Sequence, residues 1–165
     1  MRRRTSPPHE TAGSPRPSRR IHAEVHGKLP ELAHCESCDA SYRNGRWTWE
    51  PAPADSYPAT CPACERAQSQ HPAGVLRAEG GFAVAHRDEL AAMLRNVAES
   101  ESAEHPLNRI MDIETSDLGL VITTTSARLA VSLGRALARA YGGSLDQPGT
   151  SAEQDALIRV GWVRD

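Results

Sequence analysis

The sequence has few aromatic residues and no long apolar run. Three Trp, three Tyr and one Phe make up 4% of the 165 residues, and hydrophobic residues make up 39%. That composition is lean for one large core, so we expect one domain of ordinary size or two small ones. No segment is apolar enough to cross a bilayer, and no apolar stretch follows the arginines at positions 2–4. The sequence therefore predicts no membrane span, no secretory signal and a cytoplasmic location.

Motifs of the common enzyme classes are also missing. There is no P-loop and no G-x-G-x-x-G sequence, and no serine or cysteine nucleophile or carboxylate pair is placed by motif. His86 and His105 could each act as a base, but no second catalytic group is placed beside them in the sequence. We therefore expect a non-enzymatic protein with no small-molecule substrate, and an enzyme that uses His86 or His105 stays as an alternative.

Cysteine is scarce as well, but its four copies stand in two C-x-x-C pairs. The four residues are Cys35, Cys38, Cys61 and Cys64. Two such turns predict a tetrahedral zinc site, and a reducing compartment favours metal over disulfides. Redox dithiols are the alternative, but their C-x-x-C motif sits at a helix start in a thioredoxin-like context that is absent here. Because four thiolates fill a tetrahedral shell, the predicted Zn²⁺ is structural.

The first thirty residues differ in composition from the rest. Residues 1–30 hold seven Lys or Arg and two Glu, a net charge of +5, which leaves −7 for the remainder of the chain. Ser, Pro and Arg dominate there, and nothing could form a core to offset chain entropy. We predict a disordered basic tail, which either lies along nucleic-acid phosphates or serves only for solubility.

Residues 31–70 are expected to form a four-cysteine zinc ribbon. A strand begins at Tyr42, Asn44-Gly45 is a strong hairpin turn, and the chain returns through residues 46–49. Residues 50–60 are a proline-rich loop that leads to the second cysteine pair, and residues 65–70 form a short helix or turn. So small a unit cannot bury enough apolar area to fold alone, and metal binding would contribute roughly 10–16 kcal/mol.

Residues 74–165 are expected to form a second, α+β domain. The pattern predicts strands at 75–78, 108–114, 120–125 and 157–163, helices at 87–102 and 126–141, and a short extended piece at 144–145. The order strand, helix, strand, strand, helix, strand is the ferredoxin-like arrangement, an antiparallel sheet with both helices on one face. The other face would then need a cover. Ser126 is expected to cap the second helix, although free N–H groups at that helix start could instead hold an anion.

Two groups of side chains are candidates for nucleic-acid binding. On the ribbon hairpin, Trp47 and Trp49 could stack on bases while Arg43 and Arg46 contact phosphates; alternatively, the aromatics pack the ribbon on the second domain. On the second helix, Arg128, Arg135 and Arg139 return to one face, opposite an apolar stripe that contains Leu129, Leu133 and Leu137. This basic stripe either binds phosphates or is only a solvent-exposed face of the helix.

Several phrases resemble a group of small bacterial zinc-ribbon proteins. They are Cys61-Pro-Ala-Cys-Glu-Arg66, His71-Pro-Ala-Gly-Val75, His105-Pro-Leu-Asn-Arg-Ile110, Thr123-Thr-Thr-Ser-Ala-Arg-Leu-Ala130 and Ala140-Tyr-Gly-Gly143. The ribbon of that group is similar to the N-terminal region of the eukaryotic and archaeal adaptor of the large ribosomal subunit, though the further cysteine pairs of the adaptor are absent here. The resemblance implies association with a ribosome or RNA, and it carries over only the four cysteines.

These observations together favour a zinc-binding, non-enzymatic adaptor that binds RNA or a ribonucleoprotein. The tail and the ribbon hairpin would supply most contacts, because the acidic remainder of the chain disfavours a large footprint on phosphate. The alternative is a protein-interaction module that uses the face or edge of its sheet to bind a protein partner or its own copy.

Overall fold

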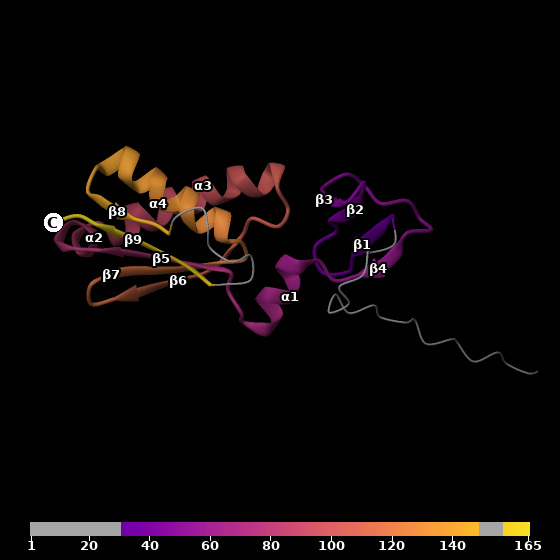
Figure 1. Cartoon of the computed structure of the whole chain (residues 1–165), viewed down its shortest axis with the longest axis horizontal. Helices are drawn as coiled ribbons and strands as arrows, with labels where there is room; N and C mark the ends of the chain where they lie inside the picture. The colour runs from indigo at the N-terminus through magenta and orange to yellow at the C-terminus, as the bar shows by residue number, and fades with distance from the viewer. Residues whose placement is uncertain (1–30, 149–156) are drawn as a thin grey trace, which may run out of the picture.

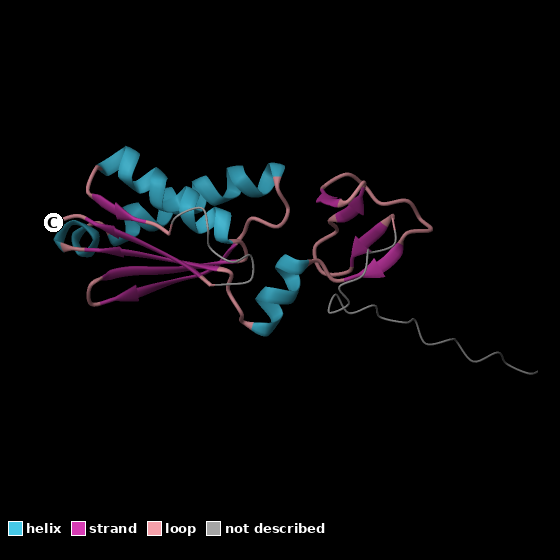
Figure 2. Cartoon of the chain, in the orientation of Figure 1, coloured by secondary structure: helices cyan, strands magenta, loops and turns pink. Residues whose placement is uncertain are grey.

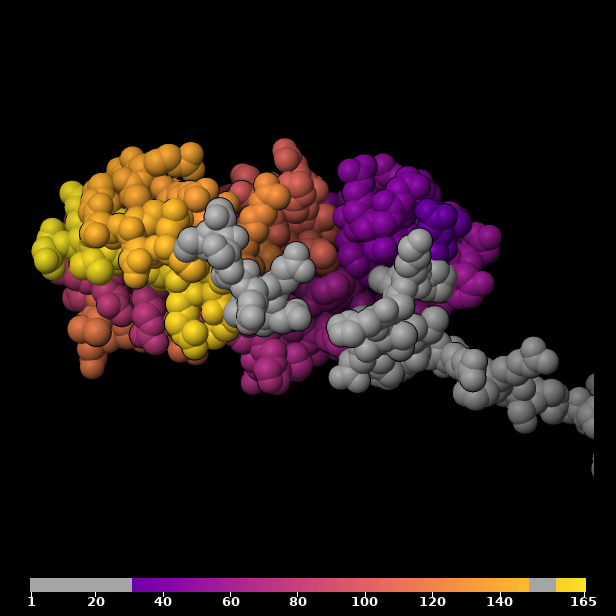
Figure 3. Space-filling view, in the orientation of Figure 1, coloured from indigo at the N-terminus to yellow at the C-terminus, as the bar shows by residue number. Residues whose placement is uncertain are grey.

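Two small β-sheets organise the chain, the first followed by one helix and the second covered by several (Figure 1). The computed structural model describes residues 31–148 and 157–165, so the predicted basic tail lies outside the described residues. We call residues 31–70 the cysteine module, and residues 74–148 with 157–165 the α/β module. Each has its own cluster of buried apolar side chains, and Figure 3 shows the two modules lying against each other.

The cysteine module is a four-stranded sheet followed by a helix. Its elements are β1 (Ala33–Cys35), β2 (Ser41–Arg43), β3 (Arg46–Thr48), β4 (Tyr57–Ala59) and α1 (Pro62–Ser69), with sheet order β3-β2-β1-β4. The hairpin turn is confirmed, since Asn44 and Gly45 both have positive φ (50° and 79°) between paired strands. The sequence interpretation missed β1 and β4, which are three residues each, and α1 begins at Pro62 rather than at Glu65.

The α/β module contains the remaining helices and strands (Figure 2). They are β5 (Gly74–Glu79), α2 (Gly81–Ala85), α3 (Arg87–Glu104), β6 (Ile110–Ser116), β7 (Gly119–Thr124), α4 (Ala127–Tyr141), β8 (Ser144–Asp146) and β9 (Ile158–Val163). The predicted helices and strands are present with ends shifted by up to two residues, but α2 was missed because Gly80-Gly81 indicates a break. Among the residues described, none of the helices is long and apolar enough to span a bilayer.

The strand pairing of the second sheet corrects one prediction. The order is β6-β7-β5-β9-β8, and β9 runs parallel to β5. A fully antiparallel ferredoxin-like sheet is therefore wrong here. The reason is β8, which follows α4 and reverses the chain once more than expected, so that β9 enters between β5 and β8 in the opposite direction. A mixed sheet with two helices is what the structure has.

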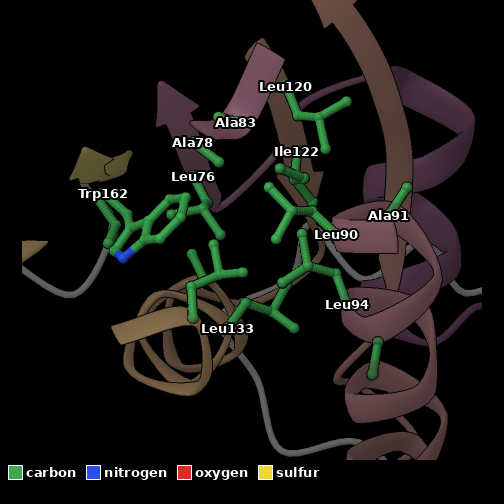
Figure 4. Close-up of a cluster of buried hydrophobic side chains, with 14 of the residues drawn as sticks. Leu76, Ala78, Ala83, Leu90, Ala91, Leu94, Leu120, Ile122, Leu133 and Trp162 are labelled. Carbon is green, nitrogen blue, oxygen red and sulfur yellow. The ribbon is translucent and has the colours of Figure 1, made fainter. Parts of the chain in front are cut away.

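The core of the α/β module lies between the sheet and helices α3 and α4. Both helices cover the same face of the sheet. Figure 4 shows Leu76 and Trp162 from the strands meeting Leu90 and Leu94 of α3 and Leu133 of α4, and all five are fully buried. The predicted apolar stripe of α4 and the apolar residues of α3 therefore face the core. Their spacing of three and four residues explains why these segments are helical.

The opposite face of the sheet carries both charged residues and valines. Strand alternation places Arg77, Glu114 and Arg159 on it, and all three are exposed. Arg77 and Glu79 form a 3.7 Å ion pair there. Val75, Val121 and Val163 share that face and are not buried, so the need for a cover over this face stays a prediction.

Candidate metal centre

The four cysteines converge on one point of the cysteine module. Cys35 ends β1, Cys38 lies in the turn that follows, Cys61 is the N-cap of α1, and Cys64 lies in its first turn. Their Sγ atoms all lie within 4.8 Å of one another. All four are free thiols, and only Cys38 is more than slightly exposed.

Backbone donors orient the sulfurs. The N–H of Cys61 donates to Cys35 Sγ at 3.3 Å, and the N–H of Cys64 donates to Cys61 Sγ at 3.4 Å. Pro62 occupies the first helical position, where a missing N–H costs nothing and the fixed φ favours the helix. The C-P-A-C sequence thus begins a helix whose free N–H groups point at sulfur, which stabilises thiolate character.

Because the four thiols lie close together and are mostly buried, their pKa values differ from one another. Burial raises the pKa of Cys35, but N–H donors from Cys61 and Ser37 outweigh it and lower that pKa to about 7. For Cys61 burial raises the pKa strongly, and the negative charges of Cys35 and Cys38 raise it further. Burial also raises the pKa of Cys64. Four thiolates packed this closely repel one another, so a cation is needed to hold all of them ionised.

The cluster fits a tetrahedral metal ion. The sulfurs of a zinc tetrathiolate lie about 3.8 Å apart, as follows from Zn–S bonds of about 2.3 Å, and Cys38 Sγ lies 3.7 Å from Cys61 Sγ. The chemistry of the donor set, four soft thiolates, suits zinc and excludes hard cations such as magnesium. His34, next to Cys35, lies outside the cluster and is hydrogen-bonded through Nδ1 to Ser56 at 2.8 Å.

Arg109 reaches the cluster from the α/β module. Its Nη2 lies 3.2 Å from Cys61 Sγ, 3.5 Å from Cys38 Sγ and 3.6 Å from Cys64 Sγ. Burial lowers the pKa of Arg109, but the hydrogen bond to Cys64 and the nearby thiolates outweigh it and raise that pKa. The sequence interpretation missed this residue. The phrase His105-Pro-Leu-Asn-Arg-Ile110 contains it, but nothing in that phrase indicates a contact with sulfur.

The four hairpin residues predicted to contact nucleic acid differ in their burial and in their partners. Trp47 is buried in the cysteine module and packs against Tyr42, with ring centroids 5.5 Å apart. Because Trp47 is buried, little of its ring is available for stacking on a base. We therefore remove it from the residues predicted to contact nucleic acid. Trp49 is 41% exposed, and its Nε1 donates to the carbonyl oxygen of Ser102 at 2.6 Å. Arg46 is exposed, and Arg43 is paired with Glu50 at 3.2 Å.

The predicted basic stripe lies on the outer face of α4. Arg128, Arg135 and Arg139 are all exposed, and Arg135 donates to Gln147 Oε1 at 3.2 Å. A hollow of about 550 Å³ beside them is lined by Ser132, Arg135, Ala138, Arg139 and Leu145. Among the described residues, no hydrogen bond or ion pair links these arginines to the predicted group on the hairpin. The start of α4 is capped as expected, because Ser126 Oγ accepts from the N–H of Leu129.

The two histidines considered as bases lie far apart along α3. His86 Nδ1 lies 3.0 Å from Glu89 Oε2, and Tyr141 donates to Glu89 Oε1 at 2.9 Å. These hydrogen bonds, the one from Tyr141 foremost, lower the pKa of Glu89. His86 also stacks on Phe82, with ring centroids 4.2 Å apart. We interpret this exposed cluster as a structural contact that connects the start of α3 to the end of α4. His105 is exposed at the other end of α3.

Comparisons with known protein families, with curated proteins and with solved structures find no match for this chain. The resemblance to bacterial zinc-ribbon proteins therefore stays a prediction. The functional argument depends on the geometry described above.

Proposed function

We propose that this protein is a zinc-binding, non-enzymatic adaptor that binds RNA or a ribonucleoprotein. The observation that carries the zinc assignment is the convergence of four Sγ atoms within 4.8 Å. Cys35, Cys38, Cys61 and Cys64 would hold the ion, which fills its shell with thiolates and so stabilises the fold. The loaded unit would be a zinc ribbon, beside an α/β module with a mixed five-stranded sheet.

The RNA assignment is supported by Trp49 and the arginines around it. Trp49 is exposed but held in place by its bond to Ser102. A fixed aromatic plane loses little conformational entropy when an unpaired base stacks on it. Arg46 on the same hairpin is exposed, and Arg95 lines a groove of about 340 Å³ together with Ser102. The arginines of α4 would add phosphate contacts at a distance from this site.

A protein partner is the second candidate function. Tyr57 on strand β4 is 55% exposed and Leu32 is 37% exposed, and the N–H of Tyr57 donates to the carbonyl oxygen of Leu32. Tyr57 lies on β4, an edge strand of the first sheet, and an exposed apolar side chain on an edge strand suits pairing with another chain. Recovery of partners from lysate with and without nuclease separates the two functions. If RNA connects this protein to its partners, nuclease releases them, whereas a direct protein partner stays bound.

RNA binding is expected to weaken steeply with salt. For a labelled single-stranded RNA and three to five neutralised phosphates, raising salt from about 50 to 200 mM should reduce affinity roughly 20- to 130-fold. Fluorescence anisotropy on the full chain measures this. Arg135→Gln with Arg139→Gln should flatten the salt slope, whereas Arg77→Gln on the opposite sheet face should not. Binding that is absent at low salt, or insensitive to salt, would overturn the RNA assignment.

Trp49→Ala is expected to weaken binding of the same RNA by about 1–3 kcal/mol, the contribution of one stacked base. The salt slope should stay unchanged, because no phosphate contact is removed. Tyr57→Ala, an exposed aromatic on another strand, is the matched control and should leave RNA affinity as it is. Equal losses in both variants would mean that the hairpin aromatic has no specific role.

A further inference from the structure

The cysteine cluster contains a side chain from the other module. Arg109 lies 45 residues beyond Cys64 and 71 beyond Cys38 in the chain. Its guanidinium nevertheless lies within hydrogen-bonding distance of three of the four sulfurs, and Nη1 adds a second contact to Cys64 Sγ at 3.6 Å. Hydrogen bonds from a cation to thiolate are charge-assisted and stronger than neutral ones.

Arg109 is held in place by the core of the α/β module. Its N–H donates to Thr125 Oγ1, and the N–H of Thr125 donates back to the Arg109 carbonyl, both at 2.9 Å. The preceding Asn108 is buried, and its Oδ1 accepts from Ser126, the cap of α4, at 2.8 Å. Leu107 packs on the apolar cluster of the cysteine module. The segment 107–109 therefore connects both modules rigidly.

Whether the guanidinium of Arg109 is stable beside the sulfurs depends on the net charge of the cysteine cluster. Four thiolates with one divalent ion carry a net charge of −2, and Arg109 supplies a partial counter-charge. The Nε atom of Arg109 is buried without a hydrogen-bond partner among the described residues. Arg109 as a whole is partly buried, and withdrawing a guanidinium from water is costly unless its partners are negatively charged. The docked position of Arg109 thus favours the ionised sulfurs that a bound metal maintains.

We propose that Arg109 makes the cysteine cluster a metal-dependent junction between the two modules. The loaded centre holds the α/β module docked through Arg109, and loss of the metal releases it. By linkage, docking of Arg109 must strengthen metal binding by the same free energy. This inference rests on the zinc part of the proposed function and describes the regulation of that same site. It does not depend on RNA binding.

Two variants and one control test the junction in the full-length, zinc-loaded protein. Arg109→Gln removes the charge and keeps a polar side chain of similar shape. Arg109→Lys keeps the charge but loses the planar guanidinium group. Arg95→Gln is the control, because Arg95 lines the same groove as Arg109 but makes none of the sulfur contacts. Transfer of zinc to a colorimetric chelator gives the metal affinity. Hydrogen exchange of residues 105–110 reports on docking.

Arg109→Gln is expected to weaken zinc binding by about 10- to 100-fold, as for other partners of metal ligands, and Arg109→Lys by less. In the zinc-loaded Gln variant, residues 105–110 should exchange faster while residues 33–43 stay protected. That combination separates undocking from unfolding of the cysteine module. The Arg95→Gln protein should match wild type in both measurements.

Equal zinc affinity and equal exchange in wild type and Arg109→Gln would overturn the junction and leave the zinc assignment standing. Absence of stoichiometric metal in wild type would instead overturn the zinc assignment itself. If Arg109→Gln fails to fold, Arg109→Lys still decides. Weaker zinc binding than in wild type with residues 33–43 still protected supports the junction, and zinc affinity and exchange at 105–110 equal to wild type would refute it.

Discussion

Replacing Cys61 with serine is expected to abolish stoichiometric zinc binding and to unfold the cysteine module. Cys61 is fully buried and caps α1; its Sγ lies 3.7 Å from Cys38 Sγ, and its N–H donates to Cys35 Sγ. The apolar cluster of this module consists mostly of alanine and cysteine with one tryptophan. Such a core cannot offset the conformational entropy of folding. A structural zinc ion contributes roughly 10–16 kcal/mol in comparable peptides, so its loss exceeds any stability that the module has alone.

Metal content of protein purified without chelator, and hydrogen exchange across residues 31–61, measure this effect. The α/β module should keep its helical circular dichroism, because its core is a separate cluster. Glu36→Gln, an exposed change between the first two ligands, is the matched control and should bind one equivalent of zinc. A serine variant that retains full protection in the cysteine module would show that the fold does not depend on the ion.

Trp162→Ala is expected to destabilise the α/β module by about 3–5 kcal/mol, the usual cost of removing a large buried aromatic side chain. Trp162 is fully buried on β9 and is the largest such side chain in the described chain. Its ring lies edge-on to Phe82, and its Nε1 donates to the Gly142 carbonyl at 2.7 Å. The substitution opens a cavity and leaves that carbonyl without its partner.

Urea unfolding followed by far-ultraviolet circular dichroism gives the change in the free energy of unfolding. Val163→Ala is the control, since Val163 is the next residue on the same strand and is 44% exposed. We expect it to cost about 0.5 kcal/mol or less. Zinc stoichiometry should stay unchanged in both variants where they are folded. Similar costs for the two substitutions would mean that β9 does not pack as described.

Local patterns were sufficient for much of the fold. Leu129, Leu133 and Leu137 recur at helical spacing, and Ser126 precedes them as a cap, so α4 was predicted to within one residue. Asn44-Gly45 predicted its hairpin because few other dipeptides accept two successive positive φ angles. Short strands without apolar alternation were missed. β1 and β4 are three residues long and owe their pairing to the cysteine turns rather than to their own side chains.

The strand order could not be read from the sequence. β8 is only three residues long, yet it reverses the chain and makes β9 parallel to β5. The pattern of apolar residues in β9 is the same for either direction, because side chains alternate in both. Direction depends on the preceding connections, and one short strand was enough to change it.

The four-cysteine cluster, by contrast, was predicted from the sequence alone. Two C-x-x-C turns bring their own sulfurs together through backbone geometry that spans only four residues each. Arg109 joined the site only in the tertiary structure, 48 residues from Cys61 and held by hydrogen bonds to Thr125. The difference has one physical reason: ligand pairs are local, whereas a counter-charge supplied by another module depends on how two separately folded cores dock.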